Sequence, residues 1–123
     1  FVCGYRYKRL DNVVRRVSSR IANTVRNGIL KDGLHDASCG IKGFRKDCIP
    51  HIIAFNGTHR FMGAIIKAAE KTVTEYKVNH HPRLHGKSKY GINNRLWRGI
   101  YDLFGMAWLL RRYVNPVVDS ESP

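Results

Sequence analysis

A helical repeat near the start of the chain constrains the fold most. Apolar residues recur there at steps of three and four, the spacing of one face of an α-helix, and they are Val14, Val17, Ile21, Val25 and Ile29. Polar and basic residues cover the remaining surface of this helix: Arg15, Arg16, Ser19, Arg20, Asn23 and Arg26. Asp11 or Asn12 can cap its start, and Gly33 suits the left-handed position at its end.

A second long helix is expected near the other end, from about Asn93 to Tyr113. Its apolar face is broad and comprises Leu96, Trp97, Ile100, Leu103, Phe104, Ala107, Trp108 and Leu110. Such a face can pack in a core. Because four arginines accompany it (Arg95, Arg98, Arg111 and Arg112), the helix can instead lie on the surface of an anionic membrane.

Strand patterns lie at 1–7 and, most clearly, at 72–79, where apolar and polar residues alternate. Residues 37–44 suggest a strand or extended loop, 47–55 a helical turn near Pro50, and 58–69 a helix capped by Thr58. The alternation predicts an α/β unit with about three strands. Because the chain opens on Phe1 in an apolar strand pattern, we expect it to be part of a longer protein, with 1–113 structured and 114–123 a flexible tail.

The charge balance favours an anionic partner. Lysine and arginine number 22 against 9 aspartates and glutamates, a formal net charge of +13. Nucleic acid, a phosphorylated small molecule and an acidic membrane surface all suit this charge. The three cysteines follow no metal-ligand spacing and are expected to be reduced thiols. No apolar run reaches about 18 residues, so no bilayer-spanning segment is predicted.

Three basic clusters are interleaved with small or hydroxyl residues: 4–6, 15–20 and 80–91. In the first, Gly4 lets a ligand approach the backbone and Arg6 offers a planar fork for phosphate. In the second, Arg15 and Ser19 lie four residues apart on one helix face, where a guanidinium and a hydroxyl can hold one phosphate together. The third is a glycine-containing loop able to close over an anion.

Each cluster also has a purely structural interpretation. Arg6 can pair with a carboxylate, the basic helix face can simply be solvated, and the 80–91 loop can be ordinary surface. His80 and His81 are neighbours in a strand-like segment and point to opposite faces, so a shared metal ion is not expected.

Taken in order, five motifs resemble the second half of family 2 glycosyltransferases, in the subgroup of dolichyl-phosphate mannose synthase-like and undecaprenyl-phosphate sugar transferases. The motifs are Gly4-Tyr5-Arg6, the stretch from Arg15 to Asn23, the stretch from Asp36 to Arg45, His59-Arg60-Phe61, and His80 to Gly91 followed by Asn94-Arg95-Leu96-Trp97. The resemblance implies the C-terminal half of a GT-A (nucleotide-diphospho-sugar transferase, Rossmann-like) domain. It also implies an upstream half that binds the nucleotide and chelates Mg²⁺ or Mn²⁺ through paired aspartates, a motif that this sequence lacks, so no metal ligand is expected in this chain.

The resemblance also implies site residues. Those expected to bind the acceptor phosphate are Arg6, Arg15, Ser19 and Arg83. Those expected in the closing loop are Ser88 and Lys89. Those expected to line the sugar pocket are Asp36 and Ser38. This interpretation requires Arg6, Arg15 and Arg83 to gather around one anion pocket.

The mechanism inferred from the sequence needs no base. A hydroxyl acceptor requires a carboxylate to remove its proton. In many family 2 members, by the resemblance, that base lies in an acidic motif just before a helix, but the comparable stretch here, 56–61, has no acid. A phosphate acceptor is already anionic and needs positive charge to hold it in line with the anomeric carbon. His59 as a base is the competing interpretation.

The leading hypothesis is therefore an inverting transferase. It moves a hexosyl group of mannose or glucose type from a GDP- or UDP-sugar to a polyprenyl phosphate, peripherally at the cytoplasmic membrane face, and this chain alone is expected to be inactive. The alternative is a basic nucleic-acid-binding module. Against that alternative, exposed aromatic residues do not alternate with basic ones as a stacking platform needs.

Overall fold

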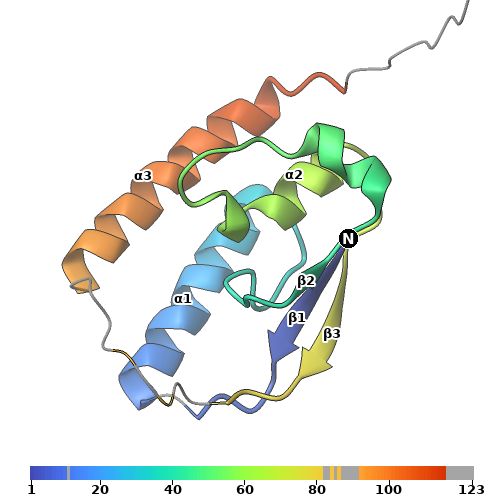
Figure 1. Cartoon of the computed structure of the whole chain (residues 1–123). Coiled ribbons are helices and arrows are strands. Elements are labelled where there is room, and N and C mark those ends of the chain that lie inside the picture. Colours follow the sequence, from blue (N-terminus) through green and yellow to red (C-terminus); the bar gives the residue numbers. More distant parts are fainter. Residues whose placement is uncertain (11, 82–83, 85, 87–91, 116–123) are drawn as a thin grey trace, which may run out of the picture.

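The computed structural model describes residues 1–10, 12–81, 84, 86 and 92–115. Within them it is a mixed α/β structure with a small sheet (Figure 1). The elements in chain order are β1 (Val2–Arg6), α1 (Val13–Leu30), β2 (Lys42–Gly43), η1 (Lys46–His51), η2 (Thr58–Arg60), α2 (Met62–Ala68), β3 (Thr74–Val78) and α3 (Ile92–Arg111), where η marks a 3₁₀ turn. The predicted strands, the two long helices and the helical turn around Pro50 are confirmed, although β2 is only two residues long and Thr58 begins a 3₁₀ turn instead of capping α2.

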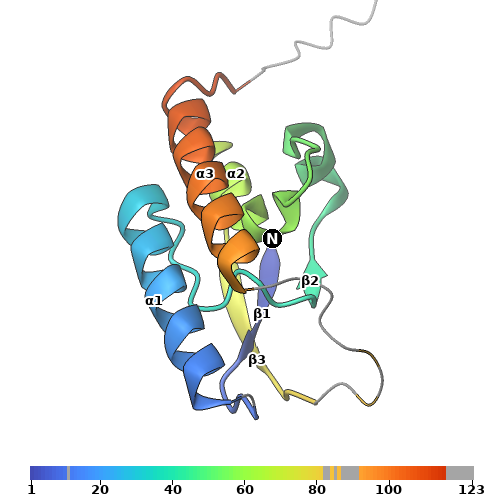
Figure 2. The same ribbon diagram turned by 90° about the vertical axis from the view of Figure 1, so that its left-hand side faces the viewer.

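The sheet has the strand order β2-β1-β3. β1 is central and pairs parallel with β3, from Val2 opposite Thr74 to Arg6 opposite Val78. On its other side β1 pairs antiparallel with the short β2. The two long helices run side by side, on the same side of the sheet, in both views (Figures 1 and 2).

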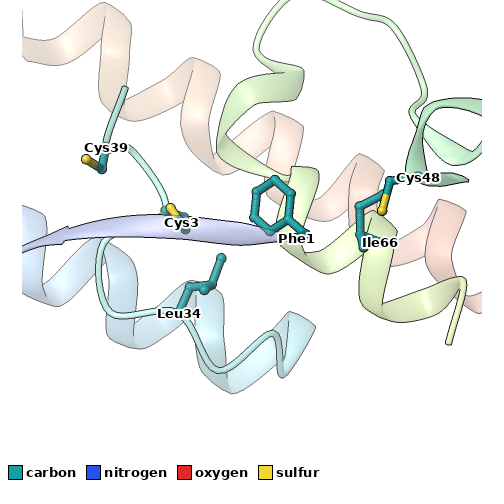
Figure 3. Close-up of a cluster of buried hydrophobic side chains, with 7 residues drawn as sticks. Phe1, Cys3, Leu34, Cys39, Cys48 and Ile66 are labelled. Atoms are coloured by element: carbon teal, nitrogen blue, oxygen red, sulfur yellow. The ribbon is translucent and has the colours of Figure 1, made fainter. Parts of the chain in front are cut away.

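Two hydrophobic clusters form the core. The first joins β1 to the loop after α1 and to α2, and six of its members are labelled in Figure 3: Phe1, Cys3, Leu34, Cys39, Cys48 and Ile66. The second joins α2 to α3 and comprises Phe61, Ile65, Leu103 and Met106. α2 contributes to both clusters and thereby ties α3 to the sheet. The three cysteines are free and buried, as expected for reduced thiols, and burial raises the pKa of Cys3 to about 11.

The ends of α1 follow capping chemistry, with one correction. Asn12 is the N-cap, and its side-chain oxygen accepts a hydrogen bond from the Val14 amide at 3.0 Å. At the other end, the left-handed cap is Lys31 (φ 53°), whose amide donates to the Asn27 carbonyl at 2.9 Å. Gly33 (φ 77°) is also left-handed but lies two residues beyond the cap, so its prediction as the terminal residue was wrong.

α1 contacts the rest of the protein through its polar face. Arg26, expected on the surface, is buried with only 8% of its area exposed, and Asn23 and Asn27 are half-buried. The apolar stripe lies on the outside, with exposed fractions from 41% at Ile29 to 62% at Val14. The expectation for Arg26 failed because Asp32, six residues later, supplies a buried partner for its charge.

α3 is likewise mostly exposed. Leu103 and Met106 are buried, whereas Trp97, Phe104 and Trp108 are exposed by 60% or more. A core role therefore holds for only a narrow part of the broad apolar face. In the described part of the chain, no helix is both long enough and apolar enough to cross a bilayer.

Candidate anion-binding pocket

A cavity of about 560 Å³ lies where the end of β1 and the loop after it face α1. We call it the basic pocket. The residues that line it are Tyr5, Arg6, Tyr7, Lys8, Arg9, Leu10, Arg16, Ser19, Arg20, Asn23, Thr24, Asn27, Leu34, His35 and Asp36. Five of these side chains are cationic at neutral pH and only Asp36 is anionic, so the pocket carries a positive potential that suits an anion.

Three predicted site residues form a network at the basic pocket, and two of them, Arg6 and Asp36, line it, whereas Ser38 does not. The Arg6 guanidinium holds the Asp36 carboxylate in a two-pronged ion pair, with Nε–Oδ2 at 2.6 Å and Nη2–Oδ1 at 2.8 Å. Arg6 also donates to the Ser38 hydroxyl at 3.1 Å, and this hydroxyl donates to Asp36 at 3.1 Å. Burial opposes ionisation of Asp36, but the hydrogen bonds and charge of Arg6 outweigh it and lower the pKa of the carboxyl. The sequence left two roles open for Arg6, binding a phosphate or pairing with a carboxylate. In the structure Arg6 pairs with a carboxylate.

The loop that carries Asp36 is anchored to the polar face of α1. Arg26 pairs with Asp32 (Nε–Oδ2, 3.0 Å) and donates to the Leu34 carbonyl at 2.6 Å. Asn27 donates to the same carbonyl at 3.1 Å and accepts from the Gly33 amide at 2.7 Å. Because these bonds hold residues 32–34 in place, they also determine the position of Asp36, two residues further along the chain.

Glu75 on β3 fixes the same loop from the sheet side. Its Oε1 accepts hydrogen bonds from the His35 amide at 2.6 Å and the Asp36 amide at 3.1 Å. Its Oε2 lies 2.7 Å from Nδ1 of His35. The backbone at the pocket wall is thus held between α1 and β3.

The lining of the basic pocket also includes cations to which the sequence interpretation assigned no role: Arg9, Arg16 and Arg20. Arg9 donates to the Ser19 hydroxyl at 2.6 Å, linking the loop after β1 to α1. Arg16 and Arg20 also line the basic pocket, and in the described part of the chain their guanidinium groups make no ion pair. Their four-residue spacing is the signal in the sequence that places them on one helix face.

The structure brings only some of the predicted phosphate-binding residues together. Arg6 and Ser19 both line the basic pocket, whereas Arg15 does not. Arg15 precedes Arg16 by one residue and is therefore turned by about 100° around the helix axis. Arg83, Ser88 and Lys89 lie outside the described residues. Their roles, and that of Arg15, stay predictions.

His59, the candidate base, lies elsewhere. It sits in η2 and is not among the residues that line the basic pocket. Burial lowers its pKa, and the positive charges of Arg60 and Lys42 lower it further. The imidazole is therefore neutral at pH 7 and chemically able to accept a proton, but not from a group bound in this pocket.

No group of three or more metal-ligating side chains occurs within the described ranges. Near the basic pocket, the carboxylates Asp36 and Glu75 are already engaged by Arg6 and by the 35–36 backbone. The described residues therefore do not fit a divalent metal centre.

Comparison with known proteins gives partial matches to lipid-linked sugar transferases. The chain is 34% identical over 116 residues to a dodecaprenyl-phosphate galacturonate synthase of Rhizobium johnstonii, a match that covers 92% of this chain and 34% of that protein. It is 28% identical to undecaprenyl-phosphate 4-deoxy-4-formamido-L-arabinose transferases, over 102 residues in Pseudomonas aeruginosa (83% of this chain, 30% of that protein) and over 98 in Edwardsiella ictaluri (80% and 30%). The chain thus spans about a third of the length of these curated relatives. No protein-family model and no solved structure matches it.

Proposed function

We propose that this chain is the acceptor-side part of a glycosyltransferase that moves a sugar from a nucleotide onto a polyprenyl phosphate. The observation that carries the proposal is the basic pocket, where cations from the loop after β1 and from α1 converge. Relatives named for dodecaprenyl- and undecaprenyl-phosphate sugar transfer support it. The proposal includes the C-terminal half of a GT-A domain as the fold and cell-envelope biosynthesis as the setting.

In the proposed reaction, an oxygen of the lipid phosphate attacks the anomeric carbon of the donor sugar. The bond from that carbon to the nucleoside diphosphate breaks, and the nucleoside diphosphate leaves with the electron pair. The configuration at the anomeric carbon is inverted. The phosphate is already ionised, so no side chain needs to remove a proton. Arg16 and Arg20 hold it by charge-assisted hydrogen bonds, while Arg6 and Asp36 keep the wall of the basic pocket in place.

Several parts of the proposal concern the longer protein. They are a donor site for a GDP- or UDP-sugar and an Mg²⁺ or Mn²⁺ ion held by residues outside this chain. The sugar is proposed to be a hexose of mannose or glucose type. Because the relatives' names specify galacturonate and 4-deoxy-4-formamido-L-arabinose, a donor screen includes these two sugars as well.

The decisive experiment measures binding of a short, soluble polyprenyl phosphate. We expect the chain to bind farnesyl phosphate and not farnesol, because the pocket recognises the phosphate. Arg16→Ala or Arg20→Ala is expected to weaken binding by about tenfold or more, the loss of one hydrogen bond to a charged group.

Arg15→Ala is the matched control, since it removes the same charge from the same helix outside the basic pocket. If Arg15→Ala weakens binding and Arg16→Ala does not, the phosphate lies where the sequence alone places it. Equal binding of farnesol, or tighter binding of short RNA at physiological salt, would contradict the proposal. In the longer protein, the Arg16 and Arg20 variants are expected to slow formation of lipid-linked sugar.

A further inference from the structure

One histidine of the basic pocket is held in place although most of its ring is open to solvent. His35 is among the residues that line this pocket, and 72% of its side chain is exposed. Its Nδ1 lies 2.7 Å from Oε2 of Glu75, and its ring packs against the ring of Tyr5, with centroids 5.4 Å apart. Contacts to two different strands, β3 and β1, therefore orient this imidazole.

The Glu75 carboxylate also determines which ring nitrogen is available. Carboxylate oxygens only accept hydrogen bonds, so Nδ1 carries the proton that is donated to Glu75. In the neutral ring Nε2 is then the nitrogen with a lone pair, and in the part of the chain that the structure describes it has no hydrogen-bond partner. Nε2 is thus the atom through which His35 can bind a ligand.

The charges around His35 indicate the kind of ligand. The pocket lining contributes five cations, which are Arg6, Lys8, Arg9, Arg16 and Arg20. It also contributes the phenols of Tyr5 and Tyr7 and the Asp36 carboxylate, which Arg6 already pairs. On β3 the charged groups are Glu75, which accepts the Nδ1 proton, and Lys77, which lies opposite Tyr5 in the sheet. Cations predominate, so a ligand that meets Nε2 in this pocket is an anion.

Among the described residues that line the pocket, only His35 is of a type that changes its charge between pH 5 and 8. Lysine, arginine and tyrosine lose their protons at higher pH, and Arg6 lowers the pKa of Asp36 further below this range. Protonation converts Nε2 from an acceptor into a charged donor. A bound dianion attracts that charge, so anion binding and protonation of the ring favour each other by the same factor.

We propose that His35, positioned by Glu75, is a further phosphate-binding residue of the basic pocket. In its protonated form it donates a hydrogen bond from Nε2 to the phosphate group that Arg16 and Arg20 hold, while Nδ1 donates to Glu75. The imidazolium then lies between two anions, and binding of the phosphate takes up a proton. That the phosphate belongs to a polyprenyl lipid rests on the proposed function, whereas the anion contact of His35 does not.

The test measures binding of inorganic sulfate to the chain by NMR between pH 5.5 and pH 8. Sulfate has the shape and charge of a phosphate dianion and stays ionised throughout this range, so any pH dependence comes from the protein. The wild-type affinity is expected to fall by about tenfold from pH 5.5 to pH 8, the loss of one hydrogen bond between charged groups. Long-range proton–nitrogen spectra at pH 7 are expected to show that sulfate protonates Nε2 of His35.

The variant His35→Asn separates binding from positioning. The amide nitrogen of asparagine occupies nearly the place of Nδ1 and can still donate to Glu75, but the side chain has no second nitrogen and no charge. Its sulfate affinity is expected to equal that of the wild type at pH 8 and to be about tenfold weaker at pH 5.5. His51→Asn is the matched control, because Nδ1 of His51 is also bonded, to the Tyr113 hydroxyl at 2.9 Å, but His51 does not line the basic pocket.

His51→Asn is expected to keep the wild-type pH profile, and circular dichroism checks that both variants keep their helices. A wild-type affinity that does not change with pH overturns the proposal, as does a chain that binds no sulfate at all. Equal weakening of His35→Asn at both pH values would show that His35 only supports the loop, and this also overturns it. If sulfate binds as expected and farnesyl phosphate binds at no pH, the proposed function fails and the anion contact of His35 stands.

Discussion

The two faces of α1 have opposite roles. Its inner face is polar and holds the structure together: Arg26 and Asn27 fix the loop at residues 32–34 by four hydrogen bonds and ion pairs of 3.1 Å or less. Its outer face is apolar, and the stripe from Val14 to Ile29 is exposed by 41–62%. An ordinary surface helix shows the reverse arrangement. The difference teaches that in this helix the polar residues determine stability and the apolar ones are available to a partner.

The variant Arg26→Ala is the strongest test of the structural role of the inner face of α1. The change leaves the Asp32 carboxylate buried without its partner, and breaking a buried pair in this way costs about 3–5 kcal/mol of unfolding free energy. Chemical denaturation measures the loss. Arg20→Ala, on the exposed surface of the same helix, is the control and is expected to change stability by no more than about 0.5 kcal/mol. Equal losses for both variants would contradict a structural role for the inner face.

Glu75→Ala tests the attachment of the same loop to β3. It leaves the half-buried Asp36 amide and the His35 amide without their acceptor, at an expected cost of about 1–3 kcal/mol. Faster hydrogen exchange at these two amides locates the effect. Glu75→Gln keeps one acceptor oxygen and is expected to recover part of the stability; a Gln variant as unstable as the Ala variant would show that charge, not hydrogen bonding, matters.

Acid sensitivity tests the wall of the basic pocket. Since Arg6 lowers the pKa of Asp36 in the folded protein, the ion pair stabilises the fold above the ordinary carboxyl pKa. This contribution is lost as the pH falls through the ordinary value towards the lowered one. Denaturation curves across that range are expected to show a steeper loss of stability for the wild type than for Asp36→Asn. Parallel curves would mean that the pair does not contribute.

The smallest effect is expected on the outer face. Ile21→Ser removes an apolar side chain that is 59% exposed, so the unfolding free energy is expected to change by no more than about 0.5 kcal/mol. Thermal unfolding measures it. A loss comparable to that of Arg26→Ala would show that the stripe is buried in the protein in solution.

The sequence predicted the elements well and their burial less well. Periodicity located α1 because a stripe such as Val17-Ile21-Val25 depends only on local spacing. It did not show which side of the helix faces inward, because that depends on the partner that Arg26 finds in Asp32. The capping role of Lys31 was missed since glycine is the usual left-handed residue.

The candidate site was predicted in part for a similar reason. Arg6, Asp36 and Ser38 were assigned through the resemblance, but the ion pair of Arg6 with Asp36 joins residues 30 positions apart and no local pattern contains it. The contact between Arg9 and Ser19 depends on how the loop after β1 meets α1. Arg16 and Arg20 carried a usable spacing signal, yet only the orientation of α1 distinguishes them from Arg15.

The pairing of β1 with β3 has a consequence for how the molecule reaches its fold. The central strand bonds in parallel to residues more than 70 positions later, and the Phe1 backbone nitrogen donates to the Thr72 carbonyl. During synthesis on a ribosome, β1 cannot pair with β3 until β3 has emerged. Such distant pairing closes a long loop and slows folding. During that delay α1, whose contacts are nearer in sequence, can form first.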